Sequence, residues 1–361
     1  MVLHEPGPLH GTRSRNAPCT EPSRHERRDV KRIGPIAVFL LVLASTTTGA
    51  QEPPSSSRAS DAATFRTHTD LVALNVTVTN RADKHVTGLQ PNQFVILENG
   101  VRQPLTFFSA ESVPLDLAIL IDGSASMQGK IEHARAAAAG LARSMRSGDR
   151  ASVVEFRDTV RLRQRLTTDT SAVESAIGEI VARGSTALYD ALYIALKELT
   201  TASRDEQQVR RRAIVLLSDG ADTASLSSYD DISELARRAG VVVYAVSLKS
   251  PADVALQNLS SGGRPFQRET DYGMKVLAQE TGGRAFFPEK PAELKGIYDG
   301  IAEELGHQYA IGYVPTDPRR DGAWRRVAVQ VLAGDARPRT RAGYYTPAPD
   351  RRAGPEPVSQ Q

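Results

Sequence analysis

Residues 115–305 alternate between short apolar segments and longer segments whose apolar residues recur at helical spacing. The apolar run Leu115–Ile121 is typical of a strand buried on both faces, and Lys130–Met145 has the three-to-four-residue period of a helix. This repeated alternation predicts an α/β fold, with a doubly wound and mostly parallel sheet covered by helices on both faces. Further strands are expected at Ala151–Phe156, Val160–Leu166, Ala213–Leu217, Val241–Leu248 and Ala285–Phe287. Further helices are expected at Ala172–Ala182, Leu188–Leu199, Tyr229–Ala239, Gly273–Glu280 and Ala292–Leu305.

One of these strands has the pattern of a sheet edge. In Val160–Leu166, Arg161, Arg163 and Arg165 alternate with apolar or uncharged residues. Charged side chains are common on edge strands, where they discourage pairing with another chain. We therefore expect a half-exposed edge strand with all three arginines facing solvent.

Oxygen-bearing side chains follow the predicted strands at three places. Asp122-Gly123-Ser124-Ala125-Ser126 comes directly after the first strand, Thr186 precedes a helix, and Asp219 follows Ala213–Leu217. In an open α/β sheet, ligands bind beyond the carboxyl ends of the strands, so these segments can meet at one edge. Carboxylate and hydroxyl oxygens suit a hard cation such as Mg²⁺, which also keeps several waters. The sequence therefore predicts a divalent-cation site here.

The order and spacing of these segments resemble a von Willebrand factor A domain with a complete metal-ion-dependent adhesion site, over about Pro114 to Leu305. The resemblance implies that Ser124, Ser126 and Thr186 supply hydroxyl oxygens, and that Asp122 and Asp219 bind the metal directly or through water. It implies Mg²⁺ as the cofactor, with Mn²⁺ or Ca²⁺ as alternatives. It also implies a protein partner that offers an Asp or Glu carboxylate to an open metal position, and a final helix able to couple the site to domain posture.

The segments on either side of this domain have a different pattern. Leu71–Val78 alternates apolar and polar residues, and Phe94–Leu97 and Val101–Phe108 flank Glu98-Asn99-Gly100 as a hairpin. After the domain, strands are expected at Gln308–Val314, Trp324–Leu332 and Thr340–Tyr345. Because so few strands cannot form a stable sheet alone, we expect residues 66–112 and 308–347 to form one small antiparallel β-sandwich flanking the domain at 113–307. Core or interdomain packing is expected for the aromatic residues Phe107, Phe108, Trp324, Tyr344 and Tyr345.

Short matches in these flanks resemble exported acidobacterial proteins related to the A-domain family. They are Val86-Thr87-Gly88-Leu89 and Glu98-Asn99-Gly100 before the domain and Ile311-Gly312-Tyr313 after it. This resemblance carries no activity with it.

Residues 1–50 have the composition of a secretory signal peptide. Basic residues at 24–32 precede the uncharged apolar segment Ile33–Ala44, and the small residues Thr48–Ala50 follow. We therefore expect an exported protein, periplasmic or secreted. The apolar segment is shorter than the ~20 residues that cross a bilayer, which favours a cleaved signal peptide. An uncleaved membrane anchor is the alternative. Cys19 lies before this segment, so the mature chain should lack cysteine. Residues 51–65 are a predicted linker and residues 348–361 a predicted disordered tail.

Charge and motif content limit the function classes. Outside residues 1–50, basic and acidic residues balance at 38 each, which gives no electrostatic reason to expect nucleic-acid binding. The chain lacks Gly-x-Ser-x-Gly and His-Glu-x-x-His, and His133 and His307 fall within or at the end of predicted helices. We therefore predict a metal-dependent binding module and no enzyme. The alternatives are a metal-free structural envelope module and, less favoured, a metal-dependent hydrolase.

Overall fold

The computed structural model describes residues 71–110, 113–202, 210–219, 222–248 and 269–348. The predicted signal peptide and linker, and the predicted disordered tail after Ala348, lie outside these residues. No helix within the described ranges combines the length and apolar character needed to cross a membrane.

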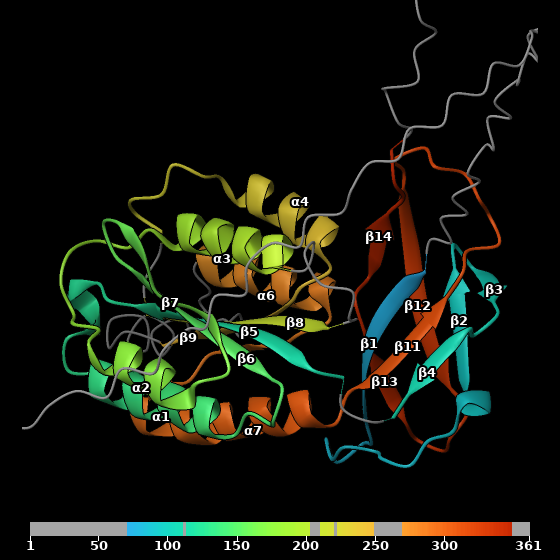
Figure 1. Cartoon of the computed structure of the whole chain (residues 1–361), viewed down its shortest axis with the longest axis horizontal. Helices are drawn as coiled ribbons and strands as arrows, with labels where there is room; N and C mark the ends of the chain where they lie inside the picture. The colour runs from blue at the N-terminus through green and yellow to red at the C-terminus, as the bar shows by residue number, and fades with distance from the viewer. Residues whose placement is uncertain (1–70, 111–112, 203–209, 220–221, 249–268, 349–361) are drawn as a thin grey trace, which may run out of the picture. The chain divides into compact units, whose positions relative to one another are not determined.

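A six-stranded sheet with the order β10-β9-β8-β5-β6-β7 forms the centre of the α/β part (Figure 1). Its strands are β5 (Leu115–Asp122), β6 (Arg150–Phe156), β7 (Val160–Thr167), β8 (Arg211–Ser218), β9 (Val242–Ser247) and β10 (Ala285–Phe286). All pairings are parallel except that of β7 with β6. The mostly parallel α/β fold expected from the sequence is therefore confirmed.

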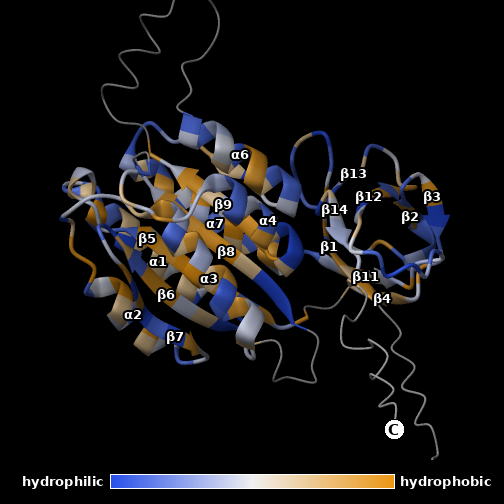
Figure 2. Cartoon of the chain, turned by 90° about the horizontal axis from the view of Figure 1, so that it is seen from above, coloured by the Kyte–Doolittle hydropathy of each residue, from blue (hydrophilic) through white to orange (hydrophobic). Residues whose placement is uncertain are grey.

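Helices cover both faces of this sheet (Figure 1). One face carries α1 (Ile131–Arg143), α2 (Thr170–Gly178) and α7 (Leu294–Gly306), which follows the short turn η3 (Pro291–Glu293). The other face carries α3 (Leu188–Ala202), α4 (Tyr229–Ala239) and α6 (Glu269–Thr281). Each expected helix is present: α4 has the expected ends, the others have ends shifted by a few residues, and α6 starts earlier than expected. Figure 2 shows the hydrophobic colour concentrated on the central strands between these helices.

All eight residues of β5 are buried, which explains why its sequence is so apolar. Alternate residues contact the two helical layers: Ile119 packs in the core beneath α1 and α7, and Leu120 in the core beneath α3 and α4. The one charged residue within the apolar run Leu115–Ile121 is Asp116, which is fully buried and accepts 2.8 Å hydrogen bonds from Arg150 and Arg210. Arg210, which directly precedes β8, thus joins the start of that strand to β5.

The edge strand β7 is confirmed, but the prediction that all its arginines face solvent is wrong. Arg161 and Arg165 are exposed, whereas Arg163 is half-buried and donates a 2.7 Å hydrogen bond to the buried carboxylate of Glu155 on β6. An irregular register between β6 and β7 breaks the simple two-residue alternation.

Two four-stranded sheets form the predicted sandwich, with the orders β13-β1-β11-β4 and β14-β12-β2-β3. Before the α/β part come β1 (Val72–Thr79), η1 (Pro91–Gln93), β2 (Phe94–Glu98), β3 (Val101–Gln103) and β4 (Phe107–Ser109). After it come β11 (Tyr309–Tyr313), β12 (Trp324–Val331), β13 (Arg337–Arg339) and β14 (Gly343–Tyr345). Each sheet contains strands from both flanks, and one apolar cluster lies between them. The shared β-sandwich is therefore confirmed.

Two details of the sandwich differ from the expectation. Val101–Phe108 is not one strand: β3 pairs with β2, whereas β4 crosses to the other sheet and pairs with β11. The short strand β13 was not expected at all. Of the predicted aromatic packing, Tyr344 is buried, and Trp324 contacts Tyr345 with ring centroids 5.0 Å apart.

A buried carboxylate joins the sandwich to the α/β part. Glu304 of α7 accepts hydrogen bonds from Tyr244 of β9 at 2.6 Å and from Thr77 of β1 at 3.2 Å. It also pairs with Arg339 of β13. Because the charge is buried with partners on three other elements, α7 is fixed at its carboxyl end to both parts.

Candidate metal site

Parallel pairing brings the two predicted carboxylates to the same edge of the sheet. Asp122 is the last residue of β5, and Asp219 follows Ser218, the last residue of the adjacent strand β8. Ser124 begins the short turn η2 (Ala125–Met127), which carries Ser126 next to the strand ends. The carboxyl-end location inferred from the sequence is therefore the one observed.

Asp122 is completely buried and held by two hydrogen bonds. Its Oδ1 accepts from the backbone N–H of Ser124 at 2.8 Å, and its Oδ2 accepts from the Ser218 hydroxyl at 2.6 Å. Burial raises the pKa of Asp122 to about 6, against the lowering effect of these bonds and with a further raising contribution from the negative charge of Asp219. The site therefore contains two carboxylates near enough for the charge of Asp219 to disfavour ionisation of Asp122.

A chain of hydroxyls connects the motif loop to Asp219. The Ser124 and Ser126 hydroxyl oxygens lie 3.0 Å apart, and the Ser126 hydroxyl donates to Asp219 Oδ1 at 2.6 Å. The other carboxylate oxygen, Oδ2, pairs with the ammonium group of Lys130. Three of the predicted oxygen ligands are thus in contact, and the positively charged ammonium group of Lys130 lies beside them.

Thr186 is held next to this loop through its backbone. The Ala125 N–H donates to the carbonyl of Gly184 at 3.0 Å, and the Arg183 N–H donates to the carbonyl of Gly123 at 2.7 Å. Thr186 is buried, and its own N–H donates to the Thr223 hydroxyl at 3.1 Å. Its segment is thus fixed on one side to the motif loop and on the other to the loop after β8.

The donor set fits a hard divalent cation. It offers carboxylate and hydroxyl oxygens and neither thiolate nor imidazole, and two buried carboxylates in one place need positive charge. Within the described ranges, no cluster of three or more His, Cys, Asp or Glu residues could hold a metal. A cation bound here would therefore depend on the neutral hydroxyls of the site.

Sequence reasoning missed three residues that shape the site. Ser218 hydrogen-bonds Asp122, Thr223 holds Thr186, and Lys130 pairs with Asp219. Ser218 could have been found, because it directly follows the predicted strand Ala213–Leu217 and its neighbour Asp219 was identified. A lysine just before a helix gave no signal, because such lysines usually face solvent.

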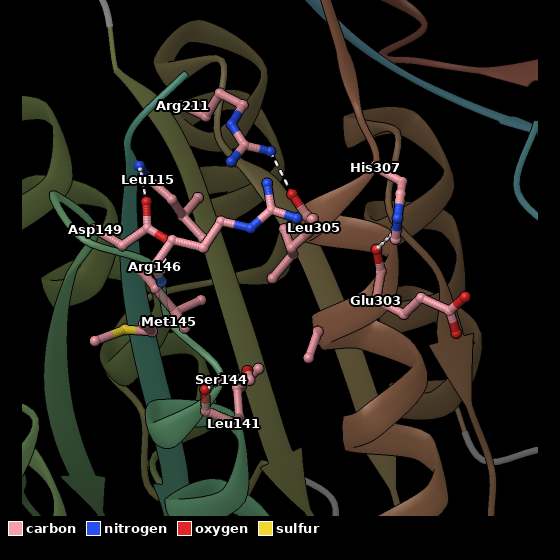
Figure 3. Close-up of a pocket in the computed structure, with 13 residues that line it drawn as sticks. Leu115, Leu141, Ser144, Met145, Arg146, Asp149, Arg211, Glu303, Leu305 and His307 are labelled. Carbon is pink, nitrogen blue, oxygen red and sulfur yellow. Dashed lines mark hydrogen bonds between the residues drawn. The ribbon is translucent and has the colours of Figure 1, made fainter. Parts of the chain in front are cut away.

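A separate cavity of about 220 Å³ lies near the amino-terminal end of β5, between α1 and α7 (Figure 3). Two of its charged groups are held by the backbone: Arg211 donates to the carbonyl of Leu305 at 2.5 Å, and Asp149 accepts from the N–H of Leu115 at 2.8 Å. Figure 3 shows both bonds at the cavity wall. None of the five predicted metal ligands lines this cavity.

Comparison with known proteins defines the class. The family model of the von Willebrand factor type A domain matches residues 116–295, the segment that contains all five predicted ligands. The chain belongs to the von Willebrand factor type A domain proteins.

Relatives of known sequence are distant. The UPF0353 protein of Mycobacterium leprae (strain TN) is 24% identical over 229 residues, which cover 60% of this chain and 66% of that protein. The UPF0353 protein of Mycobacterium marinum is 25% identical over 231 residues, covering 60% of this chain and 68% of the relative.

Solved structures resemble the chain in part. They include the vWF domain of the type V pili tip protein Mfa5 from Porphyromonas gingivalis (14% identity, 54% of this chain and 96% of that chain, TM-score 0.42). Another is proximal thread matrix protein 1 from the mussel byssus with a zinc-occupied MIDAS motif (18% identity, 54% of this chain and 48% of that chain, TM-score 0.43). The match to a von Willebrand factor type A structure from Catenulispora acidiphila covers 79% of this chain and 76% of that chain (15% identity, TM-score 0.43). Because these TM-scores are below 0.5, the family assignment rests on the match to residues 116–295.

Proposed function

We propose that this protein binds a protein partner through a divalent cation held by Asp122, Ser124, Ser126, Thr186 and Asp219. The observation that carries the proposal is the contact between Ser124, Ser126 and Asp219 at the carboxyl ends of β5 and β8. Mg²⁺ is the cation that the oxygen donors favour, with Mn²⁺ and Ca²⁺ as alternatives.

The donor set also indicates which ligand the cation would take. Three of the five ligands are neutral hydroxyls, so a divalent cation keeps much of its positive charge and favours an anionic oxygen at an open position. An Asp or Glu side chain of a partner protein supplies such an oxygen. The mussel byssus protein with a zinc-occupied MIDAS motif is a structural relative in which this type of site holds a metal.

Two further expectations belong to the proposal. The composition of residues 1–50 favours export to the periplasm or beyond. A binding role in preference to catalysis is favoured because His133 is exposed on α1 and His307 hydrogen-bonds the Glu303 carbonyl at 2.7 Å.

Metal binding is the first prediction. Adding Mg²⁺ to the full chain should raise the melting temperature, and a chelator should reverse the rise, because a ligand of the folded state stabilises it by about 2.7 kcal/mol at 100 times Kd. Asp219→Asn should remove most of this response, whereas Asp299→Asn on the exposed face of α7 should keep it. Calorimetry and thermal melting provide the measurements. A melting temperature unchanged at millimolar Mg²⁺ and Mn²⁺ would favour the metal-free structural module.

Partner binding is the second prediction. A partner captured from envelope extract should be released by chelator, should fail to bind Thr186→Ala, and should be lost when its own acidic contact residue becomes the amide. Each change removes the same metal-bridged contact, so combining them should add little. Binding measured by biolayer interferometry that persists in chelator would place the contact on another surface of the protein.

A further inference from the structure

Lys130 occupies an unusual position for a residue that precedes a helix. It follows Gly129, whose positive φ of 87° turns the chain, and its backbone N–H donates to the Met127 carbonyl at 2.8 Å. The side chain then reaches into the site and is only 18% exposed, with its ammonium on Asp219 Oδ2.

This ion pair compensates a charge that would be costly alone. The Asp219 side chain is 1% exposed, and a buried carboxylate without a counter-charge is strongly unfavourable. The Ser126 hydroxyl reaches the other oxygen, Oδ1, but carries no charge. Lys130 therefore supplies a full positive charge to Asp219 in the absence of metal.

A divalent cation and the ammonium group would compete for this position. If the metal bound Asp219, Lys130 at its present position would lie within a few ångströms of a charge of +2, and the repulsion between them is large at such distances. A lysine can leave without disturbing the backbone, because its charge is at the end of a flexible four-carbon chain. The partial exposure of Lys130 gives it a path to solvent.

We propose that Lys130 is a built-in counter-ion that holds Asp219 in the metal-free protein and is exchanged for the divalent cation when metal binds. The exchange lowers the affinity of the site for metal and releases a positive charge at its rim. There the ammonium is available to the same carboxylate-bearing partner that the metal attracts. The inference rests on the proposed metal site and adds Lys130 as the residue that sets its metal affinity.

The experiment compares the full-length wild type with Lys130→Met, which keeps most of the unbranched side chain and removes its charge. Lys295→Met is the matched control, because that lysine is exposed on α7 and pairs with Asp299. In chelator, Lys130→Met should melt at a lower temperature than wild type, since Asp219 loses its counter-charge. In calorimetric titration with Mg²⁺, and with Mn²⁺ as a second probe, Lys130→Met should bind at least tenfold more tightly. The control should match wild type in both measurements.

The outcomes separate this inference from the proposed function. Metal binding by wild type with equal or weaker binding by Lys130→Met would leave the proposed function standing and overturn the exchange. Equal melting in chelator would also overturn it, because Lys130 would then not be the counter-ion of the metal-free site. Absence of metal binding in both proteins would overturn the proposed function and the exchange together. Binding by Lys130→Met that exceeds binding by wild type supports both.

Discussion

The carboxyl group of Asp122 is buried where ionisation is unfavourable, although two hydrogen bonds favour its charged form. Its pKa is about 6 in the folded protein, compared with 3.8 for an ordinary aspartate. At a pH between these two pKa values, Asp122 still holds a proton in the folded state, whereas the unfolded state has released it. The contribution of Asp122 to stability is therefore fully present below pH 4 and is lost as the pH rises through 6.

This linkage gives a prediction at the scale of one residue. In chelator, the unfolding free energy of wild type should fall by up to about 3 kcal/mol between pH 4 and pH 7 relative to Asp122→Asn, which has no proton to lose. Urea denaturation of both proteins across this pH range is the measurement. Parallel pH profiles for the two proteins would contradict the raised pKa of Asp122.

At the scale of elements, the sequence predicted strands and helices most accurately where burial or capping alone determines the residue pattern. The strands β5, β8 and β9 are buried on both faces, so their near-continuous apolar runs were readable. Helix α4 was found with its observed ends, because Ser228 caps its start and Gly240, with a φ of 61°, terminates it. Here local signals and tertiary burial agree.

Elements defined by long-range pairing were harder to predict. β3 and β4 are three residues each and pair with strands of different sheets, so no local pattern separates them within Val101–Phe108. β13 contains Pro338 and charged residues, and it exists because it pairs with β1 more than 250 residues earlier. At the candidate site, the predicted ligands share a family motif, whereas Lys130 contacts Asp219, 89 residues away, through an ion pair that motif spacing does not predict.

At the scale of the whole molecule, a single buried carboxylate connects the two flanks of the α/β part. Glu98 of β2 accepts hydrogen bonds from Arg325 of β12 at 2.9 Å, Tyr313 of β11 at 2.7 Å and Tyr344 of β14 at 2.9 Å. Burial, followed by the hydrogen bond to Glu98, raises the pKa of Tyr313 far above its usual range, so this hydroxyl remains a donor. Three strands after the α/β part thus share one side-chain hydrogen-bond acceptor from the segment before it.

The last prediction tests this dependence with Glu98→Gln. The substitution removes the closest charge opposite the buried guanidinium of Arg325 and should lower the unfolding free energy by about 3 kcal/mol, because the remaining charged partner, Asp317 at 3.4 Å, is only partly buried. Glu234→Gln is the matched control: Glu234 pairs with Arg238 on the exposed face of α4, and its loss should cost less than about 0.5 kcal/mol.

Hydrogen exchange shows whether the flanks respond together. In Glu98→Gln, amide protection should fall in β2 and, to a similar extent, in β11 and β12, because these strands bury one core and share one network. Protection in β5 and β8 should fall less, since their core lies between helices of the α/β part. A loss confined to β2 and β3, with β11 and β12 unaffected, would mean that the two flanks do not fold as one sandwich, despite the strand pairing that joins them.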